Sequence, residues 1–130
     1  MDKETLENYR YIKKEIRQLE RRISRLHAPL SDRVTASNAE FPYQPIHVRI
    51  EGVDIKKQAL EEILRKRLAA CLDETIRIED FISSIEDSRT RMVFQRRYVD
   101  GWSWQKISRS MGSMDESHAR KIQNRFLKNH

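Results

Sequence analysis

The chain has 130 residues, of which 38% are hydrophobic and 35% are charged. This length is typical of one domain with a modest core, and the charged composition is typical of long helices. Its three glycines and three prolines are too few for the many turns of an all-β fold. The single cysteine excludes an intramolecular disulfide and a cysteine-based zinc site. This composition predicts an all-α protein. We find no apolar run of membrane-spanning length, and with the single cysteine this leads us to expect a cytoplasmic location.

The net charge of +6 is concentrated towards the C-terminus. Residues 1–83 hold 16 basic and 15 acidic side chains, whereas residues 84–130 hold 10 basic and 5 acidic ones. A localised positive surface attracts polyanions through counterion release and long-range steering. Nucleic acid therefore leads the expected partners, ahead of an acidic protein or an anionic membrane.

Two apolar rows, each advancing by alternate steps of three and four residues, predict two long helices. The first row predicts a helix over about residues 3–27 and contains Tyr9, Ile12, Ile16, Leu19, Ile23 and Leu26. The second predicts a helix over residues 54–83, with Asp54 as its N-cap, and contains Leu64, Leu68, Cys71, Thr75, Ile78, Ile82 and Ile85. Narrow rows of this kind join one helix to another, either in an antiparallel hairpin or in a coiled coil between chains. We expect residues 1–83 to form a homo-oligomer, a dimer or larger.

The connector between these helices, residues 28–53, contains all three prolines. Within it Ile46, Val48 and Ile50 alternate with polar side chains, which is the pattern of a short strand. The expected strand pairs with residues 33–37 or with another chain. A short β-ribbon is therefore expected in the connector of an otherwise helical protein.

The segment from Ser84 onward predicts three short helices. Ser84 and Asp87 have the spacing of a capping box, and the helix that follows runs to Gly101. Ser103 is the expected N-cap of the second helix, which ends at Gly112. The third begins with Asp115 as its cap; its inner face is Ala119, Ile122 and Phe126.

The second and third of these helices have the outline of a helix-turn-helix. A tight turn at Gly112 joins them, and the small side chain of Ser108 lies where they are expected to cross. The outer face of the third helix is basic. A helix of this kind fits the major groove of DNA, where its first turns reach the base edges. An ordinary three-helix bundle with a basic, solvated face is the alternative.

This segment resembles a known family. Residues 96–112 read RRYVDGWSWQKISRSMG and look like region four of bacterial sigma factors, where an arginine-tyrosine pair and a glycine precede the helix-turn-helix. The module is most similar to that of regulators of Gram-positive phages and mobile elements, of the ArpU and RinA type, and residues 40–52 look like their middle segment. The resemblance implies sequence-specific binding of promoter DNA, allows a contact with RNA polymerase, and does not imply catalysis.

Two features depart from that family. Ser113 and Met114 lie between Gly112 and Asp115, which makes the turn one residue longer than usual. Ser108 stands where alanine is usual. The longer turn can exchange the roles of neighbouring residues such as Arg120 and Lys121.

The expected DNA-binding residues lie at the start of the second helix and on the outer face of the third: Ser103, Glu116, Ser117, His118, Arg120, Lys121, Asn124, Arg125 and Lys128. Arg120 and Asn124 suit guanine and adenine edges, respectively, and Lys128 suits a phosphate. The four histidines have no paired spacing and Cys71 lies on an apolar row, so we expect neither a metal site nor an enzyme, and no cofactor.

The leading hypothesis is a DNA-binding transcriptional regulator of a phage or mobile element, in the cytoplasm of a bacterial host. Two alternatives stay open. One is a terminase small subunit that recognises viral DNA for packaging, and the other is a helical protein-protein adaptor that binds no DNA.

Overall fold

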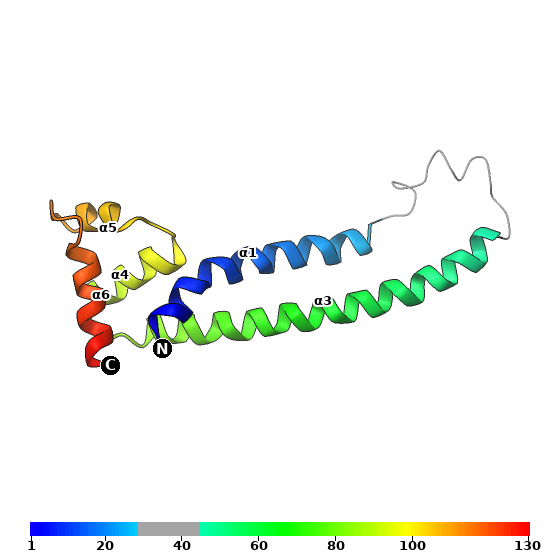
Figure 1. The fold of residues 1–130 in the computed structure, drawn as a ribbon, viewed down its shortest axis with the longest axis horizontal. Helices are drawn as coiled ribbons and strands as arrows, with labels where there is room; N and C mark the ends of the chain where they lie inside the picture. The colour runs from blue at the N-terminus through cyan, green and yellow to red at the C-terminus, as the bar shows by residue number, and fades with distance from the viewer. Residues whose placement is uncertain (29–44) are drawn as a thin grey trace. The chain divides into compact units, whose positions relative to one another are not determined.

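The computed structural model describes residues 1–28 and 45–130, with the backbone alone described for residues 45–51. The described chain forms the helices α1 (Lys3–Leu26), α3 (Pro45–Ser83), α4 (Ser88–Phe94), α5 (Trp104–Ser110) and α6 (His118–Asn129), which Figure 1 labels. A π-helical turn, η1 (Gln95–Val99), directly follows α4. No strand occurs in these two ranges. The expected all-α class is therefore confirmed.

The chain divides into two compact units. One unit joins Met1–Lys14 to Leu72–His130, and the other is Glu15–Cys71. Both long helices contribute to both units. The apolar rows of the sequence did not predict this division, because each row runs without interruption across it.

In the unit Glu15–Cys71, α1 and α3 pack as an antiparallel pair. Leu19, Ile23 and Leu64 are buried together, and Leu26, Leu68 and Cys71 pack against them. Arg67 donates to Glu15 at 2.5 Å, whereas His27 contacts Glu61, so contacts that lie later in α1 lie earlier in α3. Within this unit the two predicted rows therefore face each other inside one chain.

In the other unit, aromatic rings join the end of α3 to the short helices. The Phe94 ring centroid lies 5.9 Å from that of Phe81 and 5.4 Å from that of Phe126. Edge-to-face pairs at these distances are favourable beyond their burial. Phe81 belongs to α3, so the core of the C-terminal helices begins before Ser84. In the same unit, the Tyr9 hydroxyl of α1 donates to Glu79 at 2.7 Å.

The start of α3 corrects three expectations. The helix begins at Pro45, so Ile46–Ile50 are helical rather than a strand, and Asp54 lies inside the helix rather than at its cap. Proline suits the first position of a helix, where its missing N–H has no acceptor to lose. The short alternation also places Ile46 and Ile50 four residues apart, which is one helical face. The connector therefore ends at residue 44 instead of 53, and the expected partner strand, residues 33–37, lies outside the described residues.

The start of α4 corrects the predicted capping box. Asp87, not Ser84, is the N-cap: its carboxylate accepts from the Thr90 N–H at 3.0 Å and from the Thr90 hydroxyl at 2.7 Å. The Ser84 hydroxyl instead donates to the Phe81 carbonyl at 2.6 Å, at the end of α3. Ser84 and Asp87 therefore belong to the ends of two different helices, and their spacing does not form a capping box.

Candidate nucleic-acid interface

The candidate site is built on the turn between α5 and α6, in the unit that contains residues 72–130. Ser103 caps α5, as predicted, because its hydroxyl accepts from the Lys106 N–H at 3.1 Å. At the other end, Gly112 has φ +82°. The Ser113 N–H donates to the Ser108 carbonyl at 3.0 Å, and the Gly112 N–H to the Arg109 carbonyl at 3.0 Å. This pair of bonds is a Schellman motif, which ends the helix sharply and redirects the chain.

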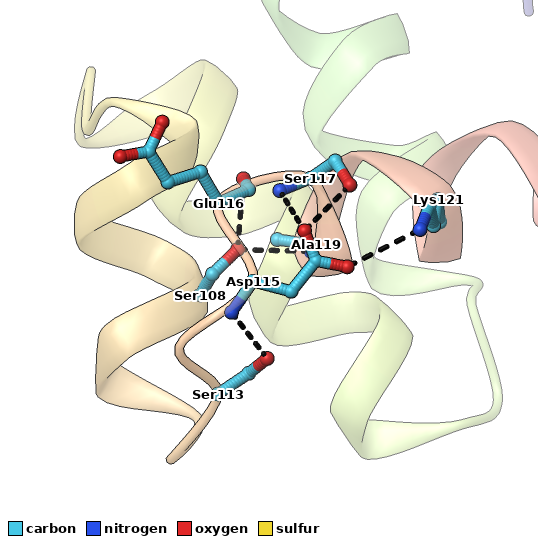
Figure 2. A network of polar contacts seen from close by, with 7 residues as sticks. All are labelled: Ser108, Ser113, Asp115, Glu116, Ser117, Ala119 and Lys121. Atoms are coloured by element: carbon cyan, nitrogen blue, oxygen red, sulfur yellow. Dashed lines mark hydrogen bonds and ion pairs between the residues drawn. The ribbon is translucent and has the colours of Figure 1, made fainter.

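Asp115 organises the turn but does not cap α6, which corrects the predicted cap. Its carboxylate accepts from the Ser117 N–H at 3.0 Å and from the Ser117 hydroxyl at 2.8 Å, and α6 begins at His118. Lys121 donates to the same carboxylate at 3.2 Å (Figure 2). These hydrogen bonds and the Lys121 ammonium lower the pKa of Asp115 to about 2. Asp115 holds Ser117 in the turn, so α6 begins only at His118.

Ser108 lies where α5 crosses the start of α6 and is fully buried. Its hydroxyl donates to the Glu116 carbonyl at 3.2 Å and accepts from the Ala119 N–H at 3.0 Å (Figure 2). The first four N–H groups of a helix have no partner within the helix. The hydroxyl of α5 thus satisfies one of these groups on α6, so Ser108 does more than leave space. The sequence showed its size but not its partners.

Residues of α6 advance by about 100° each. The buried side chains Ala119 and Gln123 face the other helices, and the exposed ones face away. On the outward face, Arg120 and Asn124 lie to one side, and the other side carries Lys121, Arg125 and Lys128. Five of the nine predicted residues therefore share one exposed surface, which we call the α6 outer face.

The remaining predicted residues lie around it. Glu116 and Ser117 belong to the turn before α6, and His118 is the first residue of the helix and partly buried. Ser103 is exposed, but it lies at the start of α5 with its oxygen engaged in capping. Because α6 begins at His118, Glu116 and Ser117 lie before the helix, whereas Arg120 and Asn124 lie on it.

The same unit carries further cations. A groove of about 360 Å³ between α4 and α6 is lined by Arg89, Lys121 and Arg125, among others. On η1 and α5, the guanidinium of Arg96 and the ammonium of Lys106 lie 4.9 Å and 4.1 Å from the centroid of the Trp102 ring. Contacts of this kind hold a cation in place over an aromatic face. Both tryptophans also pack against the buried cluster that includes Ile107, as predicted for Trp104.

Behind the α6 outer face lies a buried polar pair that the sequence did not predict. The Tyr98 hydroxyl donates to Gln123 Oε1, and Gln123 Nε2 donates to Asn124 Oδ1 at 3.2 Å. Gln123 is fully buried, and burial raises the pKa of Tyr98 to about 12. One feature of the sequence indicates this pair: Gln123 is a glutamine on an otherwise apolar helical face, four residues after Ala119.

The described residues contain no helix that is long and apolar enough to cross a bilayer. In the same ranges, no three His, Cys, Asp or Glu side chains are grouped so that they could hold a metal ion. No family model matches the chain, and comparisons with curated proteins and with solved structures give no significant match.

Proposed function

We propose that the protein binds double-stranded DNA sequence-specifically and regulates transcription. The observation that carries this proposal is the α6 outer face, where exposed basic and amide side chains project from a helix that follows a tight turn. α5 packs across α6 through Ser108, α6 also packs on α4, and α5 also packs on η1. In this proposal α5 and α6 form a helix-turn-helix, with α6 as the recognition helix.

A helix with its side chains is about 10–12 Å wide, and the major groove of B-DNA is about 12 Å wide. Arg120 and Asn124, four residues apart, reach one set of base edges. On the other side of the face Lys121, Arg125 and Lys128 bind the phosphates, which hold the helix in register. Arg89, at the edge of the neighbouring groove, extends the positive surface along α4.

The resemblance of residues 96–112 to sigma region four supports the more specific proposal of a regulator from a phage or mobile element. Such a protein acts in the cytoplasm of the bacterial host and contacts RNA polymerase. We also propose that it is a homo-oligomer, because DNA-binding dimers use two half-sites about one helical turn apart.

The direct test is a titration of the full-length protein against duplex fragments from the parent genome, at several salt concentrations. Unaltered protein should select a subset of fragments, with an affinity that falls as salt rises. The double variant Lys121→Ala/Arg125→Ala should lower the slope of log K against log salt by about 2, because about 0.9 ion is released per phosphate neutralised.

The matched control is Lys56→Ala/Lys66→Ala, which removes two exposed cations of α3 and should change neither affinity nor slope. An equal loss in the control would contradict the proposed site. Absence of DNA binding at low salt would favour the adaptor. Ring-sized assemblies that select fragments from a packaging locus would favour the terminase.

A further inference from the structure

The buried Tyr98 and Gln123 side chains form a chain of hydrogen bonds that ends at the α6 outer face. Tyr98 is 5% exposed and Gln123 is fully buried, whereas Asn124 is exposed. Among the described residues, no buried side-chain nitrogen or oxygen lacks a hydrogen-bond partner. The chain therefore connects the core of the unit to a residue of the proposed recognition surface.

Each link of the chain joins one donor to one acceptor. A tyrosine hydroxyl has one proton to donate, and it gives this proton to Gln123 Oε1. The oxygen of the Gln123 amide therefore faces Tyr98, and its NH₂ group faces Asn124. That NH₂ group can only donate, so it holds Oδ1 of Asn124 at 3.2 Å. The NH₂ group of Asn124 keeps both protons for an outside partner, whereas Oδ1 keeps one of its two acceptor positions.

We propose that Tyr98 and Gln123 are positioning residues that fix the Asn124 amide as a hydrogen-bond donor towards DNA. This inference rests on the proposed function. It favours one base: a guanine offers two acceptors, N7 and O6, to the NH₂ group in the major groove, whereas the adenine pairing of asparagine also needs Oδ1, which already accepts from Gln123 Nε2. The favoured partner of Asn124 is therefore guanine, not the adenine that the residue type alone suggests.

The test begins with selection from a random duplex library by the unaltered protein and by Asn124→Ala. The position at which Asn124→Ala abolishes discrimination is the position that Asn124 reads. The unaltered protein should prefer guanine there. Adenine or cytosine, each of which offers an amino group, would overturn the inference even though DNA binding itself stands.

The second step is Tyr98→Phe, which removes the hydroxyl and keeps the ring. Without that proton, the side-chain amides of Gln123 and Asn124 can both flip, which exchanges the positions of their oxygen and NH₂ group. The ratio of adenine to guanine affinity at the Asn124 position should then rise about tenfold, with preferences at other positions and the slope against salt unchanged. The matched control is Tyr9→Phe, which removes a hydroxyl bonded to Glu79 in the same unit and should leave the ratio unchanged.

A third measurement is independent of DNA. In the free protein, the side-chain amide NMR signals of Asn124 should shift in Tyr98→Phe and stay in place in Tyr9→Phe. Unchanged signals in both variants would overturn the hydrogen-bonded chain. If the unaltered protein binds no duplex, the proposed function and the base preference fall together, whereas an NMR response alone would still show that the three side chains are coupled.

Discussion

At the scale of single residues, one buried hydroxyl links α5 to α6. Ser108 is fully buried and links the Glu116 carbonyl to the Ala119 N–H. An alanine would fit the same space but would leave the buried Ala119 N–H without its acceptor. A larger side chain would keep the helices apart. Serine thus meets a steric and a polar requirement together.

We predict that Ser108→Ala lowers the free energy of unfolding by about 1 to 3 kcal/mol, the cost of an unsatisfied buried donor. Ser108→Leu should also destabilise the protein and in addition weaken DNA binding, because overpacking costs about 1 to 3 kcal/mol and displaces α6. Urea titration followed by circular dichroism measures both. Ser84→Ala, at an exposed serine, is the control; an unchanged midpoint for Ser108→Leu would mean that the helices do not cross at this residue.

The turn before α6 should respond to acid through Asp115. Its folded-state pKa is about 2, below the ordinary value of 3.8, owing chiefly to hydrogen bonds from Ser117. A lowered pKa means that the ionised carboxylate stabilises the fold above pH 3.8, and that this contribution is lost as pH falls towards 2. Asp115→Asn keeps an acceptor but no titrating group. The stability difference between the two proteins should shrink between pH 3.8 and 2, and a constant difference would contradict the assignment.

At the scale of helices, two glycines differ in backbone conformation. Gly112 has φ +82° at the end of α5, a conformation that favours glycine, whereas Gly52 lies inside α3. Apart from the adjacent residues and the nearby backbone of the same helix, a Cβ atom added at either position would meet no atom within 4 Å. The effects of substitution therefore report backbone conformation rather than crowding.

Gly112→Ala should lower the free energy of unfolding by about 1 to 2 kcal/mol, because an L side chain is strained at positive φ. Gly52→Ala should raise it by up to about 1 kcal/mol, the difference in helix propensity. Thermal melting of both variants provides the comparison. A destabilising Gly52→Ala would contradict the extension of α3 to Pro45.

The sequence predicts those features of the helices that are set locally. The row spacing predicts α1 and the end of α3, and the sequence predicts the Ser103 cap because capping involves residues close in the chain. The sequence does not predict the start of α3, because a short apolar alternation fits a strand and a helix equally well. The bonds of Ser108 and Gln123 could not be predicted, since their partners come from other helices. The exposed cations of α6 were found because their spacing is helical.

At the scale of the whole molecule, part of the α3 row has no apolar cover among the described residues. Val53 and Leu60 continue the row of Leu64, at spacings of seven and four residues, and are 45% and 36% exposed. Residues that repeat in this way lie on one helical face. The packed part of the row stabilises the hairpin, and the exposed part offers apolar surface for the proposed self-association.

Sedimentation equilibrium should therefore show a dimer or a larger species for the unaltered protein. Leu60→Lys should shift it towards monomer without lowering the melting temperature of the hairpin. Ile23→Lys, by contrast, places a charge in the buried cluster and should unfold the hairpin. A monomeric unaltered protein would contradict self-association and leave a monomeric hairpin.

The central claim is that the α6 outer face reads DNA sequence, and the most direct measurement compares Arg120→Ala with Lys128→Ala. Each variant is titrated against the selected duplex and against a scrambled duplex over a range of salt. Arg120→Ala should lose about 1 to 3 kcal/mol on the selected duplex alone, whereas Lys128→Ala should weaken both alike and lower the salt slope by about 1. Lys121→Ala is included because the longer turn can exchange its role with Arg120. If neither Arg120→Ala nor Lys121→Ala changes the ratio of the two affinities, α6 is a non-specific anchor and the account is wrong.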